Sequence, residues 1–269
     1  MADRRVVVTD PSHPLLADFA ALGDPATRRR VERAGQYFVV EGVVAIGRLL
    51  DLPQWRVRSF ALLPRIADRI ADRLALSDAP VVVAEEEVLA QVVGFDIHRG
   101  ALASVERRDP LPAADLAGGR LFVVAEGVND HENLGTLYRN AAAFGAAAVL
   151  LDPTCADPFY RRSVRVSLGN VLAVPTGRLD PLPAGLEPLH AAGVTTVALT
   201  PGADLALRDL DPALLGPGPV AVLVGAEGPG LTDATLAAAT HRVSIPMAPG
   251  VDSLNVATAT GIALHHVAR

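Results

Sequence analysis

Short apolar runs of strand length recur along the chain and alternate with helix-like segments, and this alternation limits the fold more than any other feature. The clearest runs cover residues 81–84, 121–125, 195–199 and 220–224. Strands that alternate with helices form mainly parallel sheets, because a parallel connection must cross back to the starting end of the sheet and usually does so as a helix. The sequence therefore predicts an α/β fold.

Residues 106–119, with the sequence ERRDPLPAADLAGG, break this alternation. The segment combines two prolines, several charges and a Gly-Gly pair, and it has no helical or strand periodicity. We place a domain boundary near residue 115, which divides the chain into residues 1–115 and 116–269. The first part is predicted to contain strands at 37–40, 57–63, 81–84 and 101–105, with helices at 42–50, 64–76 and 85–93. The second part is predicted to contain strands at 121–125, 147–151, 171–175, 195–199, 220–224 and 242–246, with helices near 134–144, 158–167, 186–191 and 232–239 and at the C-terminus.

Composition excludes several classes of protein. The apolar runs are much shorter than the ~18 residues of a membrane-spanning helix, and the start of the chain lacks the apolar core of a secretory signal. The lone Cys155 cannot form an internal disulfide, so we expect a reducing, cytoplasmic environment.

The histidines show no metal-ligand spacing with cysteine or carboxylates, so we expect no metal site. A net charge of −6 argues against nucleic-acid binding by overall charge, although a local basic surface remains compatible with it.

Two arginine clusters could form such a surface, and each has two interpretations. A solvated helix face, paired in the first cluster with Asp24 and Glu32, and a grip on RNA phosphates are about equally compatible with the pattern. The first cluster contains Arg28, Arg29 and Arg30, followed by Arg33, and the second contains Arg161, Arg162 and Arg165.

The end of the chain has the pattern of a ligand site. Residues 225–230, GAEGPG, follow an apolar strand, where ligands bind in open α/β sheets, and Glu227 is a charged residue in an otherwise apolar neighbourhood. The turn has neither a P-loop lysine nor a GxGxxG fingerprint, so ATP hydrolysis and dinucleotide redox chemistry have no support. Further on, a Pro- and Gly-broken loop leads into a helix that we expect to begin at Ser253, capped by its hydroxyl. Asn255 would then lie at the entrance of this helix.

Three motifs together resemble those of the SpoU (TrmH-like) RNA 2'-O-ribose methyltransferases, a branch of the SPOUT superfamily. They are Asn133-Leu-Gly with Arg139, then GAEGPG, then Ile245-Pro-Met with Ser253-Leu-Asn255-Val, in the order and spacing of the family. The match covers about residues 119–269. The first motif lacks the proline common before Asn133. The first domain also resembles the L30e-like substrate-binding domain of rRNA-directed members, through its pattern and through Val40-Glu41-Gly42.

The resemblance implies a fold, a cofactor and a set of site residues. It implies a SPOUT domain with a parallel sheet and a deep trefoil knot, a smaller N-terminal L30e-like α/β domain, a homodimer with active sites near the subunit interface, and S-adenosylmethionine as cofactor. The catalytic positions that it assigns are Asn133, Arg139, Glu227, Ser253 and Asn255. The cofactor-binding positions are Val224, Gly225, Glu227, Gly228, Gly230, Ile245, Met247, Ser253 and Leu254.

Arg139 has a specific place in the implied reaction. A guanidinium is a poor general base, so we expect it to grip the adjacent phosphate and stabilise the developing alkoxide, with Glu227 and Asn133 orienting it. A buried ion pair with Glu227 is its structural alternative. An rRNA is the favoured substrate and a tRNA the second. A non-catalytic RNA-binding assembly factor of the same fold is the alternative from another class, and a Rossmann-type methyltransferase lacks its glycine-rich first turn here.

Overall fold

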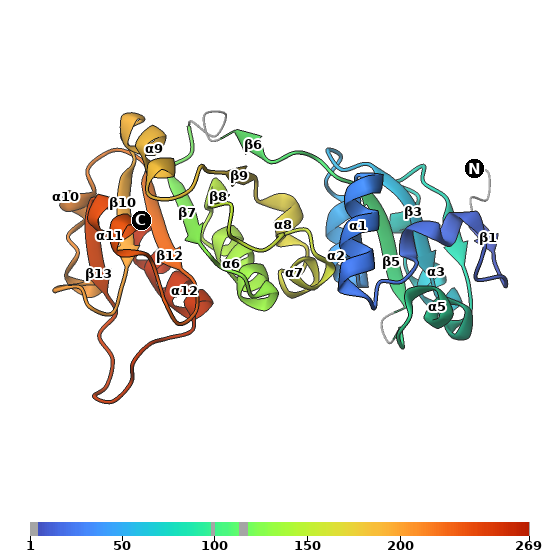
Figure 1. Cartoon of the computed structure of the whole chain (residues 1–269). Helices are drawn as coiled ribbons and strands as arrows, with labels where there is room; N and C mark the ends of the chain where they lie inside the picture. The colour runs from blue at the N-terminus through green and yellow to red at the C-terminus, as the bar shows by residue number, and fades with distance from the viewer. Residues whose placement is uncertain (1–4, 98–99, 113–117, 269) are drawn as a thin grey trace. The chain divides into compact units, whose positions relative to one another are not determined.

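The computed structural model describes residues 5–97, 100–112 and 118–268. The chain forms two compact units (Figure 1). The first contains Met1–Asp109 and Phe159–Leu172, and the second contains Pro110–Pro158 and Ala173–Arg269. The expected boundary near residue 115 lies outside the described residues. No helix in the described ranges is long and apolar enough to cross a membrane.

The first unit is built on a five-stranded mixed sheet in the order β1-β4-β3-β5-β2. Strands β1, β4 and β3 run parallel, whereas β5 runs antiparallel to both β3 and β2. The strands are β1 (Arg5–Val7), β2 (Tyr37–Glu41), β3 (Val57–Leu62), β4 (Val81–Val83) and β5 (Ala101–Glu106). The helices are η1 (Pro14–Phe19), α1 (Pro25–Gly35), α2 (Val43–Leu50), α3 (Pro64–Arg69), α4 (Ala71–Leu74) and α5 (Glu86–Val93).

The helical segment 159–172 belongs to the first unit, although the sequence alternation assigns it to the second. Its helix α7 (Arg161–Val166) packs on β2, and Phe159 contacts both Phe38 and Trp55. The indole of Trp55 also donates a hydrogen bond to the Leu172 carbonyl at 2.8 Å. These buried aromatic contacts and the indole hydrogen bond therefore hold the segment on the first unit. Hydrophobic periodicity along the sequence gives no signal of either contact.

One expected strand is a helix. Residues 171–175 read as a strand, but α8 (Asn170–Ala173) occupies this position and the next strand, β9, starts at Thr176. The Asn170 side chain donates to the Ser167 carbonyl at 2.7 Å, and the Ser167 hydroxyl accepts from the Val171 amide at 3.3 Å. These local side-chain bonds favour a helical turn over the strand preference of valine.

The second unit is built on an eight-stranded sheet in the order β11-β13-β10-β12-β7-β8-β9-β6, and all neighbouring strands are parallel. The predicted α/β fold with a parallel sheet is confirmed. The strands are β6 (Leu111–Pro112), β7 (Leu121–Glu126), β8 (Ala148–Leu151), β9 (Thr176–Arg178), β10 (Thr195–Leu199), β11 (Leu205–Ala206), β12 (Val220–Gly225) and β13 (His241–Ser244).

Helices cover both faces of this sheet. On one face, Phe122, Val124, Leu150 and Leu223 form a core with residues from η3 (Ala184–Leu186), α9 (Glu187–Ala191) and α11 (Asp233–Ala238). On the other, α6 (His131–Ala143) packs against α12 (Val256–Val267), and α12 also contacts β12 (Figure 1). The short η4 (Leu207–Asp209) and α10 (Pro212–Leu215) precede β12.

Candidate active site

A cavity of about 380 Å³ opens at the carboxyl ends of β10, β12 and β13. Three segments that are distant in the sequence meet there: residues 199–201, the turn 224–230 and the stretch 243–259. Ligands bind at this edge of open α/β sheets, and the volume is within the range of small-molecule sites.

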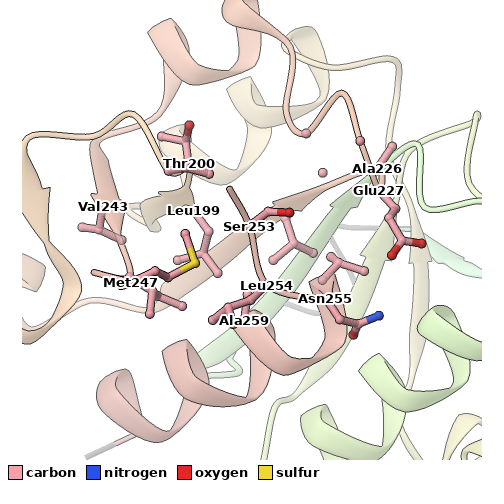
Figure 2. Close-up of a pocket in the computed structure, with 17 residues that line it drawn as sticks. Leu199, Thr200, Ala226, Glu227, Val243, Met247, Ser253, Leu254, Asn255 and Ala259 are labelled. Carbon is pink, nitrogen blue, oxygen red and sulfur yellow. The ribbon is translucent and has the colours of Figure 1, made fainter. Parts of the chain in front are cut away.

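The cavity has an apolar side and a polar side. Figure 2 shows Leu199, Val243 and Met247 gathered on one side, with Glu227 and Asn255 on the other. Ser253 lies between them (Figure 2). Such a cavity can hold a ligand with one flat apolar part and one polar or charged part.

The turn after β12 closes tightly on itself. A Cβ atom on Gly225 would lie 2.0 Å from the Gly230 carbonyl carbon and 2.1 Å from the Leu231 nitrogen, so only glycine fits. Gly228 and Gly230 have φ angles of +89° and +73°, and both open into free space. The backbone of this turn therefore stands next to the cavity with no side chain to keep a ligand away.

Three side chains from the three sequence motifs form one hydrogen-bonded chain at the polar side. The side-chain nitrogen Nδ2 of Asn255 donates to Asn133 Oδ1 at 2.7 Å, and Asn133 Nδ2 donates to Glu227 Oε2 at 3.1 Å. Asn133 is 8% exposed, whereas Asn255 and Glu227 are exposed. Glu227 Oε1 accepts no hydrogen bond from the described residues, so the chain ends in one carboxylate oxygen that remains available to a ligand.

The helix entrances fix this chain in place. Asp130 caps α6, accepting from the Glu132 and Asn133 amides at 2.9 and 2.8 Å, so Asn133 lies in the first helical turn without the proline common in the family. Asn255 caps α12, accepting from the Ala257 and Thr258 amides at 2.9 and 3.3 Å. The expectation that Ser253 caps this helix is wrong. The helix starts three residues later, and Ser253 is an exposed residue of the cavity wall.

Asn140 ties the two helices together. Its side-chain amide donates to the Ala257 carbonyl of α12 at 2.6 Å, and the small Gly261 allows this side chain to approach closely. Asn140 was not predicted as a site residue, because the role of Asn140 depends on contact between two helices more than 100 residues apart. The signal available was the run of small residues in α12, which permits close helix packing.

The structure brings most of the expected site residues together, but not Arg139. All nine residues at the implied cofactor positions line the cavity. Arg139, further along α6, is exposed and forms no hydrogen bond or ion pair with the described residues. The alternative of a buried Arg139–Glu227 ion pair is therefore wrong for a single chain, and Glu227 and Asn133 contact each other instead of orienting Arg139. Asn133 and Arg139 are six positions apart on the helix, and this spacing directs the two side chains to different faces.

Some cavity residues were missed. Leu199, Thr200 and Pro201 form the wall at the end of β10, and Ala226, Val243, Val256 and Ala259 complete the lining. The predicted strand at residues 195–199 ended at the correct place, and the rule that ligands bind after parallel strands could have identified Thr200.

The arginine clusters differ from the expected solvated faces. Arg28 is 4% exposed and its guanidinium lies 3.6 Å from the Tyr160 ring centre, and Glu32 is 3% exposed. Arg30 is exposed, and the side chain of Arg29 is not among the described ones.

In the second cluster, Arg161 and Arg165 bind the two oxygens of Glu41 at 2.9 and 3.0 Å, whereas Arg162 is exposed. Burial therefore contradicts the proposed phosphate contact for Arg28, and Arg161 and Arg165 are engaged in an ion pair.

Cys155 is buried next to β7. Its thiol donates to the Ala125 carbonyl at 3.2 Å, and burial raises the pKa of Cys155 to about 12. The thiolate is the reactive form, so this residue is structural. Within the described ranges, no group of three or more His, Cys, Asp or Glu side chains could hold a metal ion.

Comparisons with known proteins agree with this geometry. Residues 120–265 match the model of the SpoU rRNA Methylase family. A protein of Mycobacterium bovis, described as an uncharacterized tRNA/rRNA methyltransferase, is 41% identical over 263 residues, which cover 97% of this chain and 91% of the relative. A tRNA/rRNA methyltransferase of Synechocystis, also described as uncharacterized, is 36% identical over 204 residues, covering 74% of this chain and 71% of the relative.

Solved structures share the fold over nearly the whole chain. An AdoMet-bound rRNA methyltransferase from Sinorhizobium meliloti superposes with a TM-score of 0.82 and 28% identity, covering 98% of this chain and 97% of that one. The SpoU methyltransferase AviRb from Streptomyces viridochromogenes, in complex with AdoMet, gives a TM-score of 0.77 and 25% identity, covering 96% and 98%.

Proposed function

Since the chain belongs to the SpoU rRNA methylase family, we propose that it is an S-adenosylmethionine-dependent RNA 2'-O-ribose methyltransferase, with an rRNA as substrate. The observation that carries the proposal is the Asn255–Asn133–Glu227 chain at the polar side of the cavity. It unites the three motifs at one place, next to a glycine turn with open backbone.

The cavity fits the proposed cofactor. The apolar side formed by Leu199, Val243 and Met247 suits the adenine ring, and the open turn at Gly228 and Gly230 suits a close approach of the ribose or amino-acid part. When bound, S-adenosylmethionine supplies an electrophilic methyl group on a sulfonium. The neighbours with AdoMet in their structures support this assignment.

The residues of the chain align the reactants and stabilise charge. The free Oε1 of Glu227 can accept a hydrogen bond from a ligand hydroxyl or amine, while Asn133 holds the other oxygen. Alignment of two reactants supplies much of the acceleration of a displacement reaction. We assign to Arg139 a grip on the phosphate next to the reacting ribose and stabilisation of the alkoxide that forms as the 2'-hydroxyl loses its proton. Ser253 and Asn255 hold the loop at the entrance of α12.

The exposure of Arg139 supports a homodimer. An arginine without a partner among the described residues is available to a second copy, and the family resemblance places the active sites near a subunit interface. We therefore assign a homodimer in which Arg139 serves the neighbouring cavity. The deep knot at the C-terminus and the L30e-like identity of the first unit belong to the same proposal, and the whole-chain likeness to the Sinorhizobium meliloti rRNA methyltransferase supports them.

Two measurements test the proposed reaction. Mapping of 2'-O-methyl positions in rRNA and tRNA, with and without the gene, identifies the substrate; loss of no position in either RNA would refute the enzyme and favour the assembly factor. With the purified protein, Arg139→Ala is expected to abolish methyl transfer and to leave cofactor affinity nearly unchanged. Arg208→Ala is the matched control, because Arg208 is an exposed arginine that does not line the cavity.

Mixing two inactive variants tests the homodimer. Arg139→Ala keeps an intact cavity, and a cavity variant such as Gly225→Ala keeps Arg139. If Arg139 serves the neighbouring cavity, each mixed dimer contains one complete site, and random reassortment restores roughly a quarter of the wild-type activity. If the mixture remains as inactive as its components, Arg139 does not act across an interface.

A further inference from the structure

A second cavity, of about 350 Å³, lies entirely within the first unit. One wall is the turn in which β2 passes into α2, from Glu41 to Ala45. Helix α3 provides a second wall through Arg65 and Arg69, and Arg165 of α7 provides a third. Neither the family match, which begins at residue 120, nor the expected site residues other than Arg165 account for this cavity.

The lining of this cavity has excess positive charge. Glu41 is the acidic residue of the lining, and its carboxylate is already occupied by two arginines. One oxygen accepts from Arg161 Nη1 at 2.9 Å and the other from Arg165 Nη1 at 3.0 Å. With a side chain only 9% exposed, Glu41 holds Arg165 in position, and its single negative charge is already shared by two arginines.

Arg65 and Arg69 are the two arginines of the lining that Glu41 does not contact. Both are exposed, and neither forms an ion pair or a hydrogen bond with any part of the chain that the structure describes. Asp68, their neighbour on α3, is paired with Arg5 at 2.6 Å. Residues four apart lie on one helical face, where like charges weaken a helix, so helix stability does not explain this pair.

The backbone adds to the positive potential. Helix α2 has eight residues, and Gly42 at its N-cap has a φ of +98° and supplies no side-chain cap. Val43 to Ala45 line the cavity, and the amides of this first turn have no intrahelical acceptors. Together with the arginine side chains, they favour a compact anion with several acceptor oxygens.

We propose that this cavity binds a backbone phosphate of the RNA substrate, with Arg65 and Arg69 as the gripping residues and Arg165 held ready by Glu41. The inference rests on the proposed function, which supplies the polyanion. It also resolves a difficulty of that function: a chain of net charge −6 repels RNA overall, so its phosphate contacts must be local. A free phosphate ion offers the same oxygens as an RNA backbone phosphate, so the experiment must distinguish these two ligands.

The test compares two double variants. Arg65→Gln with Arg69→Gln removes both gripping charges, and since neither side chain has a partner in the described chain, the fold should persist. Arg56→Gln with Arg208→Gln removes the same charge from two residues whose side chains are 81% and 74% exposed and which do not line the cavity. Binding of a labelled RNA hairpin is measured over a range of salt concentrations without cofactor, and S-adenosylmethionine affinity is measured by calorimetry as a check on the second unit.

The expected result is specific to the cavity variant. Its RNA affinity falls about tenfold at low salt, and its plot of log affinity against log salt flattens by about one to two, as for two lost phosphate contacts. The control should change by much less. Equal affinities and slopes for the two double variants would overturn the proposal.

Two further outcomes separate the alternatives. If inorganic phosphate raises the melting temperature of the wild type but not of the cavity variant, while both bind the hairpin equally, the site takes free phosphate and the RNA proposal is wrong. If the wild type transfers no methyl group to RNA but the salt slope changes as expected, the phosphate site is supported and the proposed enzymatic function fails independently.

Discussion

The two cavities of the chain have similar volumes but are built in different ways. The cavity of the second unit, about 380 Å³, has mostly apolar walls, a glycine turn and a chain of hydrogen bonds between two amides and a carboxylate. The cavity of the first unit, about 350 Å³, is lined by three arginines around an engaged Glu41. The second unit's cavity therefore depends on backbone shape and the first unit's cavity on charge, so the two should respond to different substitutions.

Gly225→Ala should have the largest effect, and it tests whether backbone shape governs the second unit's cavity. The new methyl group would meet the Gly230 and Leu231 backbone at about 2 Å, and backbone cannot move aside as a flexible side chain can. We expect S-adenosylmethionine affinity to fall at least ~100-fold, equivalent to about 2.7 kcal/mol, as measured by calorimetry. Gly202→Ala is the control, because nothing lies within 4 Å of its Cβ. Unchanged affinity in Gly225→Ala would remove the turn from the cofactor site.

Glu41→Gln tests the opposite statement, that charge organises the first unit's cavity. The substitution leaves Arg161 and Arg165, whose side chains are 16% and 30% exposed, facing each other without an anion. Their partial exposure limits the cost to about 2 kcal/mol in the free energy of unfolding, measured by denaturant titration. Glu106→Gln, which breaks an exposed pair with Arg56, should cost under ~0.5 kcal/mol. A stable Glu41→Gln protein would show that packing, and not charge, holds this wall.

Substitutions of Asn255 separate its two roles. Asn255→Ala removes the cap of α12 and should lower the free energy of unfolding by about 1 kcal/mol. Asn255→Asp keeps a capping oxygen but loses the donor to Asn133, so its stability should change less while methyl transfer still falls by about tenfold. The comparison needs denaturation and initial-rate measurements on both variants. Full activity in Asn255→Asp would mean that the link to Asn133 does not contribute to the reaction.

The contribution of the buried Cys155 thiol to stability should be the smallest of these effects. Because burial raises its pKa from 9.0 to about 12, the thiol stays protonated in the folded state while the unfolded thiol ionises. Its contribution to stability is therefore complete below pH 9 and is lost as the pH rises toward 12. At pH 8 a thiol reagent should label the native protein far more slowly than the denatured protein. Rapid native labelling would contradict the buried position, and Cys155→Ala should remove all labelling.

The sequence predicted the longer strands of both units and missed three short ones, β1, β6 and β11. The strand at residues 195–199 and the glycine turn at 225–230 appear where they were expected, because parallel strands and positive-φ turns leave strong local signals. Strand β1 and the assignment of residues 159–172 to the first unit were missed. The place of the segment 159–172 depends on Trp55 and Phe38, which are distant in the sequence.

What the sequence alone determined is most of the residues that form the cavity of the second unit. The motifs identified Asn133, Glu227 and Asn255, and the apolar alternation indicated a parallel sheet, because both depend on residue types at short, fixed spacing. Only the tertiary structure decided which of these side chains meet. It joined the three polar residues in one hydrogen-bonded chain, made Asn255 and not Ser253 the cap, left Arg139 exposed, and buried Arg28 against Tyr160. Contacts between distant segments depend on the path of the whole chain, and no local pattern encodes that path.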